Sequence, residues 1–331
     1  MLEDIVAFSI QYSLYAGYFS IVGGVIGNAL NILTLTQLKL FRNNRSAFYL
    51  VVESTANFFS LFLSIAVNIL ISLRGDDATG TNLIWCRFRY TTSQTISLIT
   101  SYTLCFAACD QFLSTNFQLN LRNICTIRLA RYLTSIFACI WLTHSIVFVT
   151  FFEIQPQVGC VILNPISLRY STYFFYPALV GLLPICIASL FNILAFRNVR
   201  RIVRRQLPIA RRRLDQQMTA MVLTRVVMLV SLLLPYTLFR IYVINVPIVP
   251  NQSLSYAIRR LFQAIVTSCI GFNNSLSCFV FMIISPRYRR QVSFTLRKKC
   301  WRKMKSVCCI ASNQVAAENL PSPHSSNIEL E

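Results

Sequence analysis

The residue types that usually perform catalysis or bind metals are scarce in this chain and do not cluster. Its 331 residues include 2 histidines and 11 acidic residues. No Cys-x-x-Cys pair and no group of Cys with His occurs, so the sequence predicts no metal site. His144 lies in a long apolar run without a carboxylate at helical spacing, which leaves it no partner for acid–base work. We therefore expect neither an enzyme nor a bound cofactor.

Long uncharged stretches separate the few polar groups. A soluble domain carries about 25% charged residues, whereas this chain has 13% charged and 55% hydrophobic residues. Residues 5–38, 54–73, 90–109, 170–196 and 261–286 carry no charge, residues 132–152 contain only His144, and residues 216–246 contain only Arg225 and Arg240. About 20 apolar residues span a membrane as a helix. The pattern predicts an all-α membrane protein with a seven-transmembrane helix bundle. Seven buried core helices of a soluble protein are the alternative, which so little charged surface disfavours.

The positive charges gather beside alternate ends of these runs. A net charge of +20 would suggest nucleic-acid binding in a soluble protein. Here most of the 31 Lys and Arg residues lie in four segments, 39–45, 122–131, 197–225 and 287–305. Lys and Arg are enriched on the cytosolic side of membrane proteins. We therefore expect the N-terminus outside, the C-terminus in the cytosol of a plasma-membrane protein, no nucleic acid, and contact with anionic lipids of the inner leaflet.

The chain divides into four segments. Residues 1–13 are expected to be a short extracellular N-terminus, 14–285 the seven-transmembrane domain, 286–303 an amphipathic membrane-surface helix and 304–331 a disordered cytosolic tail. Tyr288, Val292, Leu296 and Cys300 recur every four residues, which predicts the surface helix. Cysteines close to the bilayer are candidate palmitoylation sites. They are Cys300, Cys308 and Cys309.

The expected topology places two further cysteines outside the cell. Cys86 lies at the outer end of the third helix and Cys160 in the loop after the fourth, both in an oxidising compartment. A disulfide between them would tie this loop across the third helix, and two unpaired cysteines are the alternative. Asn251 begins an Asn-Gln-Ser sequon in the last outer loop and is a candidate glycosylation site.

Short motifs also follow one another along the helices at characteristic spacings. They are Gly27-Asn28, Asp110-Gln111-Phe112, Trp141, Pro184, Pro235 and Ser277-Cys278-Phe279-Val280-Phe281. Their order resembles the landmarks of rhodopsin-like (class A) G-protein-coupled receptors over about residues 15–300. The overall texture is most similar to divergent invertebrate neuropeptide receptors of the FMRFamide type.

The resemblance implies a switch that faces a heterotrimeric G protein, but several of its residues depart from the family pattern. Asp110, Gln111 and Phe112 stand where the family has Asp-Arg-Tyr, and Phe281 replaces the family's helix-seven tyrosine. The family's arginine pairs with an acid on helix six, here Asp215. Gln111 cannot form an ion pair, so a Gln111–Asp215 hydrogen bond is the remaining expectation. Pairing of Asp215 with a nearby arginine is the alternative. We expect an unconventional switch.

The candidate ligand-binding residues lie in the outer halves of the helices. They are Arg240, Ser93, Tyr236, Tyr173, Phe174 and Tyr102. No lysine lies within a helix, which excludes a retinal Schiff base, and Ser93 stands where the family's amine receptors carry an aspartate. Arg240 lies one turn beyond Pro235 and is a functional-site candidate, with snorkelling to the interface as the alternative. These residues favour a ligand with an anionic or amide-rich end, most plausibly a peptide.

Two other functions remain open. The altered motifs also fit a seven-helix ligand-binding or scaffold protein that does not couple to a G protein. A channel or transporter is less favoured, because Glu53 and Asp110 lie toward the cytosolic ends of their helices and the chain has only 9 glycines.

Overall fold

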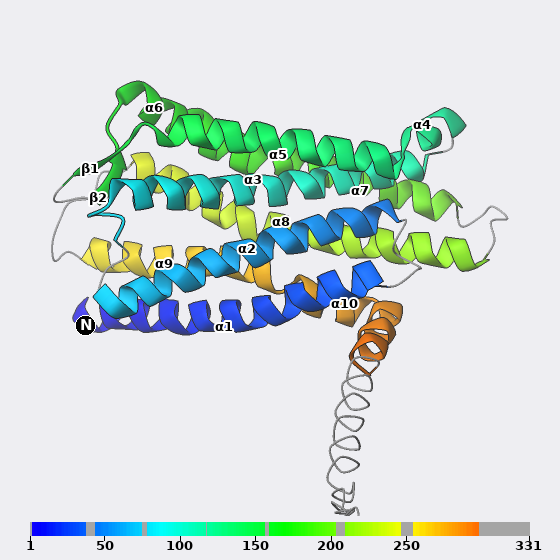
Figure 1. The fold of residues 1–331 in the computed structure, drawn as a ribbon, viewed down its shortest axis with the longest axis horizontal. Coiled ribbons are helices and arrows are strands. Elements are labelled where there is room, and N and C mark those ends of the chain that lie inside the picture. The colour runs from blue at the N-terminus through cyan, green and yellow to red at the C-terminus, as the bar shows by residue number, and fades with distance from the viewer. Residues whose placement is uncertain are drawn as a thin grey trace, which may run out of the picture.

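The structure, a computed structural model, describes residues 2–37, 44–74, 78–116, 118–155, 159–202, 209–245 and 254–297. It is a bundle of long helices that lie side by side (Figure 1). The helices are α1 (Leu2–Gln37), α2 (Arg45–Arg74), α3 (Leu83–Ser114), α4 (Leu119–Ile124), α5 (Ile127–Val149), α6 (Pro165–Tyr170), the π-helix η1 (Ser171–Leu182), α7 (Leu183–Ile202), α8 (Ile209–Asn245), α9 (Leu254–Ser275) and α10 (Ser277–Ile284).

The long helices have the dimensions and composition of membrane spans. Within the described residues, six helical segments are long and apolar enough to cross a membrane, or seven if the bent pair α9–α10 is one span. Their outward faces carry large, exposed apolar side chains, such as Phe59 at 61% exposure and Phe262 at 55%. A soluble protein rarely exposes so much apolar surface. These features indicate a multi-pass membrane protein, in agreement with the predicted helices.

One end of the bundle is closed by a disulfide-linked hairpin, and we call it the disulfide end. Strands β1 (Phe152–Gln155) and β2 (Gly159–Ile162) pair antiparallel. Cys160 in β2 is bonded to Cys86 in the first turn of α3, with 6.4 Å between their Cα atoms. The predicted disulfide is therefore present, and the hairpin adds a small sheet to the expected all-helical architecture. The N-terminal end of α1 lies at this same end (Figure 1).

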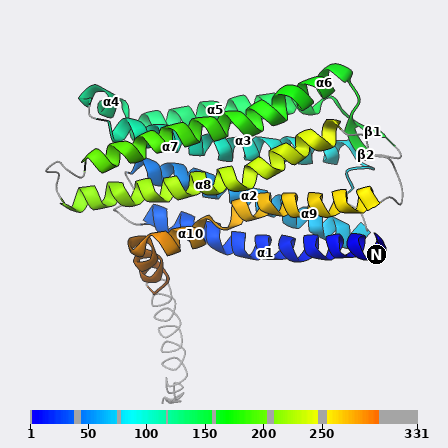
Figure 2. The ribbon, with the colours of Figure 1, turned by 180° about the vertical axis from the view of Figure 1, so that it is seen from behind.

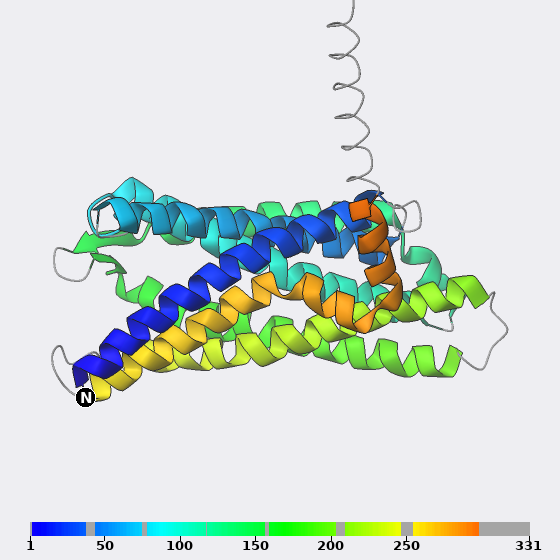
Figure 3. The ribbon, with the colours of Figure 1, turned by 90° about the horizontal axis from the view of Figure 1, so that it is seen from below.

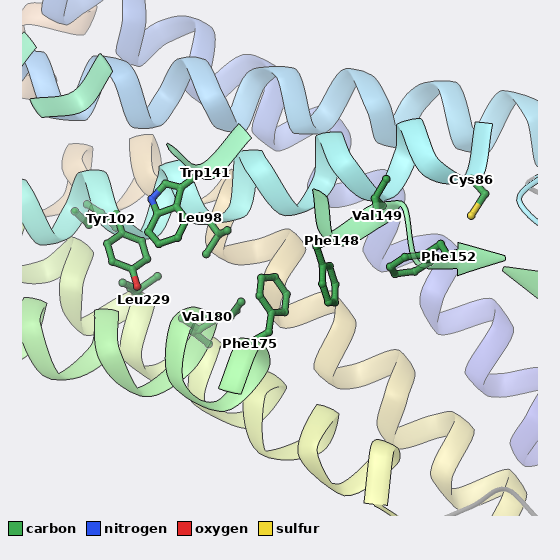
Figure 4. Close-up of a cluster of buried hydrophobic side chains, with 12 residues drawn as sticks. Cys86, Leu98, Tyr102, Trp141, Phe148, Val149, Phe152, Phe175, Val180 and Leu229 are labelled. Carbon is green, nitrogen blue, oxygen red and sulfur yellow. The ribbon is translucent and has the colours of Figure 1, made fainter. Parts of the chain in front are cut away.

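Aromatic side chains fill the core beneath the hairpin (Figure 4). Phe148 and Phe175 stack with 5.0 Å between ring centroids. Deeper in the bundle, Tyr102 packs against Trp141 at 4.6 Å. These rings join α3, α5 and η1, so the wall of the bundle on this side is held mainly by aromatic packing.

α1 is tied closely to the break between α9 and α10. Asn28 donates hydrogen bonds of 2.9 Å to the carbonyl oxygens of Gly24 and Asn274. Gly27 lies against the same break, where a Cβ atom would come within 3.1 Å of the Ser275 carbonyl oxygen. The axis bends by 58° between α9 and α10. A small residue is thus required at position 27, and the Gly27-Asn28 motif holds this bend. Figure 3 shows α1 running beside α9.

The opposite end of the bundle we call the Gln111 end. A further helix over residues 286–297 follows α10 and turns away from the bundle (orange in Figures 1 and 2). Tyr288 and Val292 are buried, as expected for the apolar stripe, whereas Leu296 is 45% exposed. Burial raises the pKa of the Tyr288 hydroxyl above its usual range, and this hydroxyl donates to Asn31 Oδ1.

Several predictions concern other parts of the chain. Asn251, Cys300, Cys308, Cys309 and the expected tail over 304–331 lie outside the described residues. The expected N-terminal segment is helical from Leu2 onward and belongs to α1.

Candidate functional site

A polar cavity of about 250 Å³ lies between α2, α3, η1, α8 and α9, in the half of the bundle nearer the disulfide end. The residues that give it chemistry are Ser93, Gln94, Ser97, Tyr236, Arg240 and Asn273. Helical spacing brings them together: Ser93 and Ser97 are one turn apart on α3, and Tyr236 and Arg240 are one turn apart on α8. The cavity is large enough for a small ligand or one terminal group of a longer one.

Arg240 is the only charged residue among the described residues that line this cavity. Its Nη2 donates to the Tyr176 hydroxyl at 2.9 Å, and its guanidinium lies 4.7 Å from the centre of that ring. Its buried Nε has no hydrogen-bond partner in the described structure. Arg240 therefore lines the cavity and retains one nitrogen without a described partner.

Gln94 adds both a donor and an acceptor to the same wall. Its side chain is 8% exposed, and neither its amide nitrogen nor its amide oxygen has a partner in the described residues. Buried polar groups are normally hydrogen-bonded. An unpaired amide and an unpaired guanidinium nitrogen on residues that line one cavity fit a ligand that carries an anion or an amide.

The structure brings together three of the predicted ligand-binding residues and places the other three elsewhere. Ser93, Tyr236 and Arg240 line the cavity. Tyr173 and Phe174 are 72% and 49% exposed on the outer face of η1. Tyr102 lies deeper in the core, where its hydroxyl donates to the Leu179 carbonyl oxygen at 3.1 Å.

Tyr173 and Phe174 were predicted from their place in the outer half of a helix, and the register of η1 turns them away from the cavity. In η1 the next two residues, Phe175 and Tyr176, face the cavity instead. A π-helix has more residues per turn than an α-helix, so a face inferred from α-helical spacing is displaced along it. Pro177 inside η1 indicates an irregular helix, but it does not show which residues of that helix face the cavity. Gln94 could not be predicted as a cavity residue, because the sequence shows only that it is a polar residue in an apolar run.

A larger groove of about 670 Å³ lies between α8 and α9 near the disulfide end. Apolar side chains such as Leu238, Tyr242 and Phe262 line it, and each is more than half exposed on the outside of the bundle. It faces outward with few polar atoms, so it lacks the convergent polar groups of the first cavity.

At the Gln111 end, Gln111 joins three helices. Its Nε2 donates to Ser46 Oγ in α2, and Thr219 Oγ1 in α8 donates to Gln111 Oε1 at 3.0 Å. Gln111 is 5% exposed. Both polar groups of its side chain are thus engaged. The described partner on α8 is Thr219. The side chain of Asp215 lies outside the described part of the structure, so the Gln111–Asp215 hydrogen bond stays a prediction.

The neighbouring motif residues have separate contacts. Asp110 pairs with Arg45 of α2 at 3.4 Å, and Arg45 also donates to the Cys125 carbonyl oxygen. Burial, together with the charge of Asp110, raises the pKa of the Cys125 thiol to about 11. Phe112 packs on Phe191 with 5.5 Å between ring centroids.

Phe281 is 1% exposed and packs on Tyr288 with 5.8 Å between ring centroids. It therefore contributes to the core that anchors the helix over residues 286–297.

A buried ion pair lies between the cavity and the Gln111 contacts. Arg225 Nε donates to Glu53 Oε1, and the two side chains are 0% and 1% exposed. Arg225 Nη1 also donates to Asn273 Oδ1 at 2.6 Å. Sequence reasoning assigned Arg225 to the cytosolic cations and missed this pair. The sequence does place Glu53 beside one apolar run and Arg225 within another. Charged groups inside a membrane protein usually pair, so this placement could have suggested the ion pair.

Comparison of the sequence with models of known protein families and with curated proteins finds no match. The chemistry of these contacts is therefore the basis for the function proposed below.

Proposed function

We propose that this chain is a divergent class A receptor of the plasma membrane, with seven spans. An extracellular peptide binds in the cavity, and the signal passes to a heterotrimeric G protein beneath the bundle. The observation that carries the proposal is the cavity at the disulfide end, with Arg240 as its only charge among the described lining residues. An anionic or amide-bearing group of the ligand would satisfy Arg240 Nε and the Gln94 amide.

Two features support the corresponding orientation. A disulfide forms in an oxidising compartment, which favours an extracellular disulfide end. The exposed arginines of the helix over residues 286–297 favour the inner leaflet at the opposite end, since cations there attract anionic lipid. They are Arg289, Arg290 and Arg297.

A second candidate is a seven-helix ligand-binding or scaffold protein that does not couple. Gln111 favours it, because its neutral contacts to Ser46 and Thr219 take the place of the arginine that the family presents to a G protein. Gln111 has no charge with which to make that contact.

A paired cell assay distinguishes the two candidates. Wild-type protein and Gln111→Arg are expressed at matched surface levels and exposed to a neuropeptide panel, with labelled-peptide binding and second messengers measured together. The proposal expects a peptide that binds both and raises a second messenger through the wild type. Binding to both with signalling only through Gln111→Arg would favour the non-coupling candidate. Absence of peptide binding would contradict the assigned ligand class.

A further inference from the structure

The ion pair of Glu53 and Arg225 connects α8 to two other helices at a fully buried position. Glu53 comes from α2 and Asn273 from α9, and Arg225 on α8 donates to both. Removing two charges from water is costly, and an apolar pair of similar size often stabilises a fold as well or better. Stability alone therefore does not account for this arrangement, whereas fixing the position of α8 does.

The third member of the cluster reaches the ligand cavity. Asn273 lines the floor of the cavity and at the same time accepts the hydrogen bond from Arg225. Asn273 is 4% exposed, and its Nδ2 donates to Asn274 Oδ1 at 3.4 Å. A ligand group that donates to Asn273 Oδ1 therefore competes with Arg225 for that oxygen.

Below this cluster, α8 has two further attachments toward the Gln111 end. Thr219 bonds Gln111, and Gln217 Nε2 donates to Ser285 Oγ. Arg225 is six residues from Thr219, or roughly 9 Å along a helix. Of these three attachments, the one at Arg225 includes both formal charges and is nearest to the cavity. Its Nη2 is buried without a partner in the described residues, so the guanidinium retains one unmet donor.

We propose that Glu53, Arg225 and Asn273 form a lock that holds the inner half of α8 against α2 and α9 and opens from the cavity through Asn273. When Asn273 turns to a ligand, Arg225 loses one of its two acceptors, and the hold of the remaining ion pair on α8 weakens. This inference rests on the proposed function in one respect, because it takes movement of α8 to be the signal that the receptor transmits.

The test is hydrogen exchange on the purified full-length protein in lipid nanodiscs, without any ligand or G protein. The double variant Glu53→Gln/Arg225→Gln removes both charges and leaves no unpaired buried ion. Asn273→Leu keeps the ion pair and removes the cavity-side acceptor, together with the weak hydrogen bond that Asn273 donates to Asn274. Thr224→Val is the matched control, because the Thr224 hydroxyl donates to the Ala220 carbonyl oxygen of its own helix and, in the described part of the chain, to no other helix.

We expect the double variant to exchange at least about tenfold faster over residues 217–230, with residues 233–243 unchanged, because local opening raises exchange only in the segment that opens. Asn273→Leu should show a smaller increase in the same segment, and Thr224→Val should match the wild type. Unchanged exchange in both lock variants, or equal acceleration in both halves of α8, would overturn the lock. If the double variant does not fold, Arg225→Lys replaces it, with the same segment required to accelerate.

A second readout separates the lock from the proposed function. Basal nucleotide exchange on added heterotrimeric G proteins is measured with the same variants. A rise in the double variant supports both the lock and coupling. Faster α8 exchange without any effect on the G proteins leaves the lock standing and counts against coupling.

Discussion

In the proposed receptor, Arg240 is the charged residue of the cavity that would select the ligand. Its Nη2 donates to the Tyr176 hydroxyl, and its Nε has no partner in the described structure. Arg240→Ala should weaken binding of an anionic peptide about tenfold to a hundredfold, since a charge-assisted hydrogen bond contributes about 1.5–3 kcal/mol. Equilibrium binding of labelled peptide measures the change. Arg259→Ala is the control, because Arg259 lies in the outer apolar groove. Equal losses in both variants would remove Arg240 from the site.

The hydrogen bond between Thr219 and Gln111 is expected to stabilise the fold where α8 meets α3. The Thr219 hydroxyl donates to Gln111 Oε1 and is buried with it. Thr219→Val keeps the shape and removes the donor. An unsatisfied buried acceptor costs about 1–3 kcal/mol, so we expect a lower midpoint of thermal unfolding. Thr224→Val serves as comparison and should change the midpoint less. Identical midpoints would mean that Gln111 finds another donor.

An element could be predicted from the sequence where the pattern that indicates it lies within one short stretch of the chain. The long helices were predictable because each apolar run has the length of a membrane span. The register of η1 was not, because a π-helix moves Phe175 and Tyr176 into positions that α-helical spacing does not indicate. The pairing of Glu53 with Arg225 joins residues 172 positions apart. Only the fold determines which of the few buried charges meet.

The contact between η1 and α8 requires a residue without a side chain. A Cβ atom on Gly181 would come within 2.4 Å of Thr237 Cγ2. Gly181→Ala should therefore destabilise the protein by about 1–3 kcal/mol through overpacking. Thr237→Ala removes the nearest atoms, so the double variant should regain part of the loss. Thermal unfolding of both single variants and the double variant gives the coupling energy. Additive effects would mean that η1 and α8 move apart at this point and so relieve the clash.

Across the whole molecule, α8 links the cavity to the opposite end of the bundle through successive polar contacts. Arg240 bonds Tyr176 beside the cavity, Arg225 bonds Glu53 and Asn273 in the middle, and Thr219 bonds Gln111 below. Elsewhere α8 packs mainly through apolar side chains such as Met221, Val226 and Leu229. These polar contacts therefore attach α8 to its neighbours at three successive levels between the cavity and the Gln111 end.

The distribution of charge along the molecule predicts its orientation in the membrane. The disulfide closes one end, and exposed arginines lie on the helix that follows α10 at the other. Positive residues are retained on the cytosolic side. An epitope tag at the N-terminus should therefore bind antibody on intact cells, whereas a tag at the C-terminus should bind only after permeabilisation. Separate cell lines carrying one tag each provide the matched control. The reverse pattern would place the cavity on the cytosolic side, and an extracellular peptide could then not be its ligand.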